Sequence, residues 1–422
     1  MTATPSTAEP AGRPALPTHA PMRQFAQSGP ELVVGGKRLS ELVAEVGQTP
    51  FYAYDRSVIA ARIAELRASL PPTVGLHYAM KANPLPALVA WMRDRVDGVD
   101  VASGGELRVA LEAGVAPQHI SFAGPGKRDA ELHQAVAAGV LVNVESAREL
   151  APLRAASQAL GLPARVAVRV NPDFELKSSG MKMGGGAKPF GVDEADVPGL
   201  LRDMGRAGLA FEGFHVYAGS QNLQAAAICE AQQKTLDLAI RLAQHAPAPV
   251  RTLNLGGGFG VPYFPGERSL DLEPIGRNLA ELAARAQAEL PQAQLVLELG
   301  RYLVAEAGVY VAQVLDRKRS HGQVFLVVDG GMHHHLAASG NFGQVLRKNY
   351  PVTIGNRMDA QQTETATVVG PLCTPLDVLA DRMQLPIAQI GDWVVVFQSG
   401  AYGASASPQA FLGHPACLEV VV

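Results

Sequence analysis

Short apolar runs alternate with longer amphipathic segments through the first three quarters of the chain. Eight runs rich in β-branched and aromatic residues begin at residues 75, 98, 119, 139, 164, 211, 251 and 293. Between these runs the apolar residues recur with helical spacing, as in 106–114, 129–139 and 277–290. Alternation of strand and helix predicts a parallel sheet. Eight repeats favour an α/β fold closed as a (β/α)₈ TIM barrel over an open sheet.

The pattern changes after about residue 308. Strand-like runs then follow one another with few helical stretches between them, at 307–320, 322–331, 366–373 and 391–403. We therefore predict a barrel over 57–308 and an antiparallel β domain formed by 29–56 and 309–422, with an early strand at 51–55. Residues 1–28 are rich in Pro, Ala and Thr and lack a signal-peptide core, which predicts a disordered tail.

The composition excludes several classes of protein. The chain has 422 residues, and its formal net charge of −3 with interspersed signs excludes a nucleic-acid or anionic-membrane partner. No apolar run approaches the roughly 18 residues that a membrane helix needs. The three cysteines are far apart in the chain, which indicates a reducing compartment and predicts a cytoplasmic protein; they are Cys229, Cys373 and Cys417.

Residues able to carry chemistry follow the strands of the predicted barrel, at the end where barrel enzymes hold their active sites. Lys81 ends the first strand, and a buried amine is costly unless it is paired or used covalently. The glycine run Gly256–Gly258 follows the seventh strand, and its backbone N–H groups can approach an anion closely. Arg301 follows the eighth strand, and its guanidinium can donate two charged hydrogen bonds to the same anion. Together these residues predict a pocket for a phosphorylated cofactor with an amine inside.

Five motifs occur in the order typical of one enzyme family. "HYAMKANP", "LNLGGGFG", "ELGR", "GPLC" followed by an aspartate, and "GAYG" resemble the ornithine/diaminopimelate/arginine decarboxylases. These are pyridoxal-phosphate enzymes of the group IV, fold type III class, with an alanine-racemase-like barrel. "GAYGASASPQAFLGHP" and "CTPLD" resemble the branch found in natural-product, siderophore and exopolysaccharide (exosortase-associated) gene clusters. The resemblance implies a decarboxylase from about residue 30 to the end of the chain.

The resemblance also implies a role for each matching residue. Lys81 would hold pyridoxal 5'-phosphate as a Schiff base, and Glu298 would face the pyridine nitrogen and favour its protonated form. Cys373 would protonate the carbon that CO₂ leaves, acting from the partner subunit of a homodimer with two shared sites. Either His215 or Tyr217 would lie against the ring. The other residues implied to bind the cofactor are Asp100, Arg169, Ser220, Gly257, Gly258, Gly300, Arg301 and Tyr402.

Departures from the family pattern concern the substrate. Well-known members have an acidic residue directly after the cysteine, where this chain has Thr374, with Asp377 three positions further on. Diaminopimelate decarboxylases also place an arginine soon after "DGGM", whereas here the first one is Arg347. A site built for a charged group discriminates strongly against other groups. We therefore predict an amino-acid substrate without a distal ammonium, acylated or linked to a carrier protein, with Thr374 and Asp377 as the substrate residues.

Other functions stay open at this point. They are a diaminopimelate decarboxylase of lysine biosynthesis, an amino-acid racemase on the same barrel, and an inactive homologue with a regulatory role. The last should have lost Lys81, Glu298 or Cys373, and all three are present. The run His333–His335 suggests a metal site, but consecutive residues do not converge on one ion in a helix or a strand. We predict no metal and expect one of these histidines to line the substrate pocket.

Overall fold

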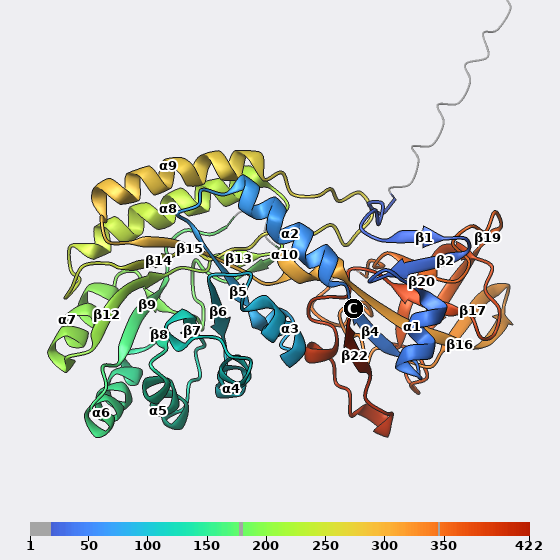
Figure 1. The fold of residues 1–422 in the computed structure, drawn as a ribbon, viewed down its shortest axis with the longest axis horizontal. Coiled ribbons are helices and arrows are strands. Elements are labelled where there is room, and N and C mark those ends of the chain that lie inside the picture. Colours follow the sequence, from blue (N-terminus) through green and yellow to red (C-terminus); the bar gives the residue numbers. More distant parts are fainter. Residues whose placement is uncertain (1–17, 177–179, 345–346) are drawn as a thin grey trace, which may run out of the picture.

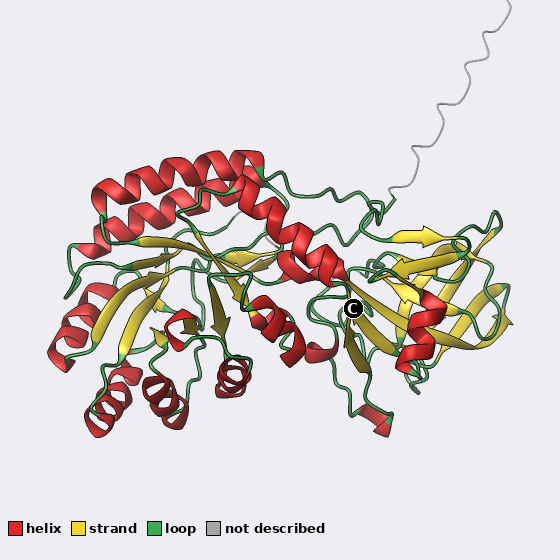
Figure 2. Cartoon of the chain, viewed as in Figure 1, coloured by secondary structure: helices red, strands yellow, loops and turns green. Residues whose placement is uncertain are grey.

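The chain folds into two lobes, a barrel ringed by helices and a lobe made mainly of strands (Figure 1, Figure 2). A computed structural model describes residues 18–176, 180–344 and 347–422. Residues 1–17, most of the predicted tail, lie outside the described residues. Among the described helices none is both long and apolar enough to cross a membrane.

Eight parallel strands form the barrel, as the alternating pattern predicts. In sheet order they are β9 (Arg165–Asn171), β12 (Ala210–His215), β14 (Thr252–Asn254), β15 (Gln294–Leu299), β5 (Gly75–Ala79), β6 (Gly98–Val101), β7 (Ile120–Phe122) and β8 (Leu141–Val144). A parallel pairing between β8 and β9 closes the ring. The prediction of a closed barrel is confirmed.

The barrel helices cover the outer face of these strands. They are α2 (Arg56–Ser69), α3 (Pro86–Met92), α4 (Gly104–Glu112), α5 (Asp129–Ala138), α6 (Leu150–Leu160), α7 (Val197–Ala207), α8 (Ala225–Ala243) and α9 (Glu273–Glu289). Successive residues of a strand point to opposite faces. On β5, Leu76 and Tyr78 are fully buried and belong to the main apolar core, whereas His77 contacts the Asp100 carboxylate of β6. The outer face therefore carries the core, and polar side chains occupy the barrel interior.

The second lobe is a separate β domain, as predicted, and its mostly antiparallel sheet also contains two parallel pairs. Its strands are β4 (Phe51–Tyr54), β16 (Gly308–Ser320), β17 (Gln323–Val328), β18 (Val352–Ile354), β19 (Thr363–Val369), β20 (Val378–Pro386), β21 (Trp393–Val396) and β22 (Leu418–Val421). Most pairs are antiparallel, and the early strand β4 joins β16 as predicted. The pairs β17–β19 and β4–β22 are parallel. Both connect segments separated by long stretches of chain, and a long connection allows parallel pairing where a tight hairpin does not.

The N-terminal segment is more ordered than its composition predicts. The predicted tail runs to residue 28, but Phe25 is buried against Phe397 with ring centroids 5.7 Å apart. The last three residues of that tail form β1 (Ala26–Ser28), which pairs with β2 (Glu31–Val34); β3 (Lys37–Arg38) and α1 (Leu39–Val46) follow. The tail prediction is wrong for these residues because it rested on average composition. Composition does not show that a single side chain such as Phe25 is buried.

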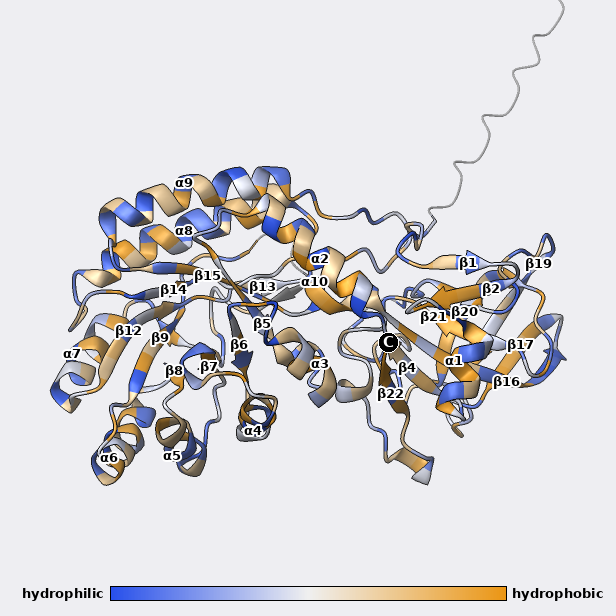
Figure 3. Cartoon of the chain, in the orientation of Figure 1, coloured by the Kyte–Doolittle hydropathy of each residue, from blue (hydrophilic) through white to orange (hydrophobic). Residues whose placement is uncertain are grey.

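Hydropathy colouring shows apolar residues gathered between the layers and polar ones on the outer faces of the helices (Figure 3).

The two lobes meet beside Lys81. The backbone N–H of Tyr402 donates to the carbonyl of Ala82 at 2.8 Å, and the Asn83 amide donates to the carbonyl of Gly400 at 3.1 Å. These bonds hold the "GAYG" segment of the strand-rich lobe over the end of β5.

Candidate active site

Lys81 lies in a short 3₁₀ turn, Met80–Ala82, at the carboxyl end of β5. Its Nζ is 3.4 Å from Oε1 of Glu298, near the end of β15. Desolvation by the surrounding barrel lowers the pKa of Lys81, but the charge of Glu298 outweighs it and raises this pKa above its usual value. The site therefore holds an ammonium paired with a carboxylate, so the amine has a partner as the sequence argument requires.

Glu298 is held from a second side by His215, the last residue of β12. Nε2 of His215 lies 3.0 Å from Oε2 of Glu298, and both side chains are almost fully buried. Burial raises the pKa of Glu298, but Lys81 and the hydrogen bond from His215 together lower it well below its usual range. The carboxylate thus stays ionised between two nitrogen groups.

A small pocket surrounds Lys81, and it gathers most of the predicted cofactor residues. Its lining comprises Ala79, Lys81, Tyr217, Ser220, Gly258, Phe259, Glu298, Leu299, Gly300, Arg301 and Tyr402. The glycines are required by close backbone approach. A Cβ on Gly258 (φ +81°) would stand 2.6 Å from the carbonyl oxygen of Gly219, and one on Gly257 would stand 2.0 Å from that of Glu298. A side chain at either position would displace the wall of the pocket.

Arg301 supplies a cation to this pocket. Its guanidinium donates to the Tyr263 hydroxyl at 3.1 Å and lies 4.7 Å from the ring centroid of Tyr402. Its Nε is buried without a hydrogen-bond partner among the described residues. A buried donor without an acceptor beside a glycine-lined pocket fits an anion such as a phosphate. Tyr263 was not predicted, although it lies in the loop that follows the glycine run.

The structure separates the two candidates for the ring-facing position. Tyr217 lines the pocket, and Nζ of Lys81 lies 5.0 Å from its ring centroid. Burial is the main cause that raises the pKa of Tyr217 to about 12. His215 points to Glu298 instead. Tyr217 thus stands in the pocket wall and His215 stands behind the carboxylate; which of them lies against the cofactor ring stays a prediction.

Asp100 and Arg169 lie in the barrel interior but outside this pocket lining. Asp100 is 3.4 Å from Nδ1 of His77, and Nη1 of Arg169 is 3.0 Å from Oε1 of Glu145. Glu145 was not predicted. It directly follows β8, so the strand-end rule that selected Lys81 would also have selected it.

Cys373 and Thr374 lie outside the Lys81 pocket of their own chain, and the Cys373 side chain is exposed. Asp377, predicted as a substrate residue, is almost fully buried. Its Oδ1 accepts from the Met332 backbone N–H at 2.6 Å and its Oδ2 from that of Leu372 at 2.9 Å. This corrects the prediction: Asp377 joins two loops, and both of its oxygens are used.

The three consecutive histidines are buried and none belongs to the lining of the Lys81 pocket, so the expectation that one of them lines the substrate pocket stays a prediction. The His335 ring donates to Ser399 Oγ at 2.9 Å, and the His334 ring donates to the carbonyl of Pro415 at 2.8 Å. Across the part of the chain that the structure describes, no group of three or more His, Cys, Asp or Glu side chains could hold a metal ion.

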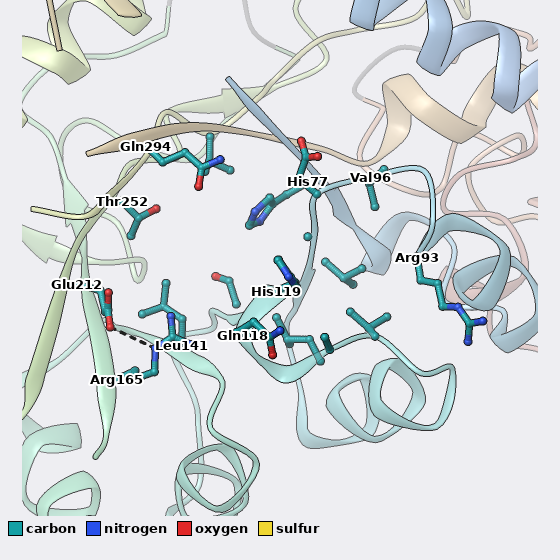
Figure 4. Close-up of a pocket in the computed structure, with 18 of the residues that line it drawn as sticks. His77, Arg93, Val96, Gln118, His119, Leu141, Arg165, Glu212, Thr252 and Gln294 are labelled. Carbon is teal, nitrogen blue, oxygen red and sulfur yellow. Dashed lines mark hydrogen bonds and ion pairs between the residues drawn. The ribbon is translucent and has the colours of Figure 1, made fainter. Parts of the chain in front are cut away.

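A larger cavity of about 660 Å³ lies at the opposite end of the barrel (Figure 4). Its walls include the first residues of several strands, such as Gly98, Arg165 and Gln294, and the Arg165–Glu212 pair. Barrel enzymes carry their chemistry at the carboxyl ends of the strands. Size alone would favour this cavity, but the amine, the carboxylate and the glycine-lined anion pocket all lie at the other end, so we assign the active site there.

Comparisons with known proteins agree with this assignment. The sequence profile described as "Pyridoxal-dependent decarboxylase, pyridoxal binding domain" matches residues 56–305. The chain is 42% identical to the L-glutamyl-[BtrI acyl-carrier protein] decarboxylase of Niallia circulans, over 89% of each chain. It is 30% identical to the 2-[(L-alanin-3-ylcarbamoyl)methyl]-2-hydroxybutanedioate decarboxylase of Staphylococcus aureus, over 89% of this chain and 95% of that one.

The fold agrees as well. The crystal structure of diaminopimelate decarboxylase from Helicobacter pylori complexed with L-lysine superposes with a TM-score of 0.80 and is 28% identical, covering 91% of this chain and 94% of that one. The residues around Lys81 fit pyridoxal phosphate, because they offer an amine for its aldehyde and a cationic, glycine-lined pocket for its phosphate. The chain belongs to the pyridoxal-dependent decarboxylase family and is a pyridoxal-phosphate-dependent amino-acid decarboxylase.

Proposed function

We propose that the protein decarboxylates an amino acid whose side chain is acylated or attached to a carrier protein, with a carrier-linked glutamyl group as the first candidate. The observation that carries this proposal is that neither Thr374 nor Asp377 offers a free carboxylate beside Cys373. Thr374 follows the cysteine, and both oxygens of Asp377 already accept backbone hydrogen bonds. The relative that is 42% identical supports it, since its name specifies a carrier-bound glutamyl substrate.

The energetics disfavour free diamino acids. A distal ammonium placed against Thr374 would be a buried charge without a partner, which costs about 3–5 kcal/mol, or roughly three decades in kcat/KM. Diaminopimelate also needs a protein group that binds its second amino-acid end. Arg347 follows the "DGGM" segment, but its guanidinium donates to the carbonyl of Val378. These features support a neutral distal end for the substrate.

The residues of the pocket would divide the chemistry among them. Lys81 would hold the cofactor covalently, and Glu298 would keep a proton on the cofactor's ring nitrogen. Arg301, Ser220 and the backbone of Gly258 would hold the phosphate, with Gly300 and Tyr402 beside it. When bound, pyridoxal phosphate supplies the electron sink that allows the bond to the departing carboxylate to break.

Cys373 would act in a homodimer with shared sites. Its thiol is exposed and lies outside the lining of its own chain's Lys81 pocket, as expected for a residue that serves a second copy. Two large apolar side chains nearby support a covered surface, since Leu376 is 55% and Phe342 is 43% exposed in the single chain. From the partner, Cys373 would return a proton to the carbon that CO₂ leaves.

The test is a substrate panel with the cofactor-loaded enzyme. CO₂ release is measured for free glutamate, ornithine, lysine and diaminopimelate, and for glutamate attached through its side-chain carboxyl to an acyl-carrier protein. We expect the carrier-linked substrate to exceed every free amino acid by at least about 10³-fold in kcat/KM. Lys81→Ala is the inactive control. Efficient decarboxylation of diaminopimelate would overturn the proposal, and stereochemical inversion without CO₂ would indicate a racemase.

Two variants test the reason for this preference. Thr374→Asp places a carboxylate directly after Cys373 and should raise activity toward ornithine or lysine. Thr374→Asn introduces a side chain of the same size as Asp but without its charge, so it should not raise activity toward ornithine or lysine. Equal activity of the two variants toward the diamino acids would show that charge at this position does not select the substrate.

A further inference from the structure

His215 occupies a position from which it can control the central carboxylate of the site. It ends β12, where its register partners are Arg169 on β9 and Asn254 on β14. Its ring reaches across β14 to Glu298 on β15, with Nε2 3.0 Å from Oε2. The other oxygen of Glu298, Oε1, faces Lys81 at 3.4 Å. The two carboxylate oxygens therefore have different partners.

The other nitrogen of His215 identifies the donor in this bond. Nδ1 is buried and has no hydrogen-bond partner among the described residues. A proton on Nδ1 would be a buried donor without an acceptor, which is unfavourable. Glu298 is ionised and can only accept. The geometry therefore favours a neutral ring that carries its proton on Nε2 and donates it to Oε2.

We propose that His215 is a positioning residue for Glu298: by donating from Nε2 to Oε2, it fixes the carboxylate so that Oε1 remains directed into the Lys81 pocket. This proposal rests on the family's use of pyridoxal phosphate, whose ring nitrogen Glu298 would face. A freely rotating carboxylate could turn either oxygen toward the nearby Lys81 ammonium. The bond from His215 removes that freedom before the cofactor arrives.

Lining the Lys81 pocket is a different role, and it belongs to another residue. Tyr217 lies two positions further on and lines the pocket, with the Lys81 amine 5.0 Å from its ring centroid. His215 is absent from that lining and is 2% exposed. Its influence on the reaction therefore passes through Glu298 rather than through direct contact with substrate or cofactor.

The test compares His215→Phe with His215→Gln. Phe keeps a planar ring without a donor, whereas the Gln amide nitrogen reaches about as far as Nε2 and can donate to Oε2. The first readout is the visible absorbance band of the bound cofactor as a function of pH, together with the dissociation constant of pyridoxal phosphate. The second readout is kcat and KM for CO₂ release from the most active substrate in the panel.

For His215→Phe we expect a shifted pH profile of the absorbance band and a fall in kcat of about 10- to 100-fold, the weight of one hydrogen bond to a charged group, with KM little changed. His215→Gln should recover most of both. His77→Gln is the matched control, because His77 is another histidine of the barrel interior but contacts Asp100. It should shift the absorbance profile far less.

Two outcomes would overturn the proposal. One is a His215→Phe enzyme that folds, binds cofactor and keeps the wild-type absorbance profile and kcat. The other is a His215→Gln enzyme as impaired as the Phe variant. If the Phe variant does not fold, ¹⁵N NMR of the wild-type ligand-free protein decides the matter. A proton on Nε2 with an unprotonated Nδ1 supports the proposal, and the opposite tautomer refutes it.

Discussion

Glu145→Gln tests the buried ion pair that supports the site. Oε1 of Glu145 lies 3.0 Å from Nη1 of Arg169, and the two side chains are 1% and 9% exposed. The same carboxylate accepts from the backbone N–H groups of Gly124 at 2.5 Å and Gly191 at 3.0 Å. Gln keeps the size of the side chain but removes its charge and turns an NH₂ group toward one of these donors. Removing one member of a buried pair costs about 3–5 kcal/mol.

The assay is urea unfolding of the cofactor-loaded enzyme, with reversibility checked. We expect Glu145→Gln to lower the free energy of unfolding by about 3–5 kcal/mol. Replacing both members, with Arg169→Met added, should recover about 1–3 kcal/mol of that loss, because no unpaired charge remains. Glu289→Gln breaks an exposed pair with Arg285 at 2.7 Å and should cost less than about 1 kcal/mol. A Glu145→Gln cost no larger than this control would refute the reasoning.

The same variant has a defined pH dependence. Burial raises the pKa of Glu145, but Arg169 and Lys127 outweigh it and leave this pKa below its usual value. A carboxylate with a depressed folded pKa contributes stability above its unfolded pKa, about 4.3, and loses it as the pH falls through the folded value. The stability difference between wild type and Glu145→Gln should therefore be constant near neutrality and shrink below about pH 4.3. A difference that stays constant down to pH 3 would contradict the assigned charge.

Three further predictions use single residues. Lys81→Ala should abolish both the visible cofactor band and CO₂ release, whereas the exposed Lys318→Ala should keep both; a retained band would reject Lys81 as the attachment point. Cys373→Ala should keep the band but lower kcat by about 10²-fold or more, unlike Cys229→Ala, and full activity would show that the thiol is not the acid. Burial lowers the pKa of His335 to about 3, so protonation favours the unfolded chain and this residue alone should remove about 2 kcal/mol of stability between neutral pH and pH 5. His335→Gln should lack this loss in urea unfolding, and parallel pH curves for the two proteins would contradict it.

Much of the fold followed from the periodicity because barrel strands are buried on both faces and bounded by helices of clear amphipathic spacing. The strand-rich lobe was harder to predict from the sequence. The direction of β19 and β22 depends on where a long connection brings the chain back, and local pattern carries no such information. The order of residues 25–28 likewise depends on the pairing of β1 with β2 and on contacts between distant segments, such as Phe25 on Phe397.

The candidate site divides in the same way. Lys81, Glu298 and Arg301 could be predicted to lie together because the ends of parallel barrel strands meet at one rim. The side-chain partners could not. Whether His215 or Tyr217 faces the amine depends on the twist of the chain after β12. The hydrogen-bond partners of Asp377 lie on two loops that come together only in the folded protein.

The residues that fit the cofactor lie apart from the loop that we propose selects the substrate. Apart from Tyr402 of the strand-rich lobe, the residues that fit the cofactor stand at or near barrel strand ends. Neighbouring strands and buried charge pairs fix them. Cys373 and Thr374 stand instead in the connection between β19 and β20, anchored from behind by the two hydrogen bonds of Asp377. Side chains on such an exposed loop can change at little cost to the fold. Asp377 holds the backbone of this loop, and the Thr374 hydroxyl accepts from the Leu376 N–H at 3.3 Å within the same loop. We therefore propose that the loop presents a neutral surface to the substrate without disturbing the carboxylate, the amine or the anion pocket of the barrel.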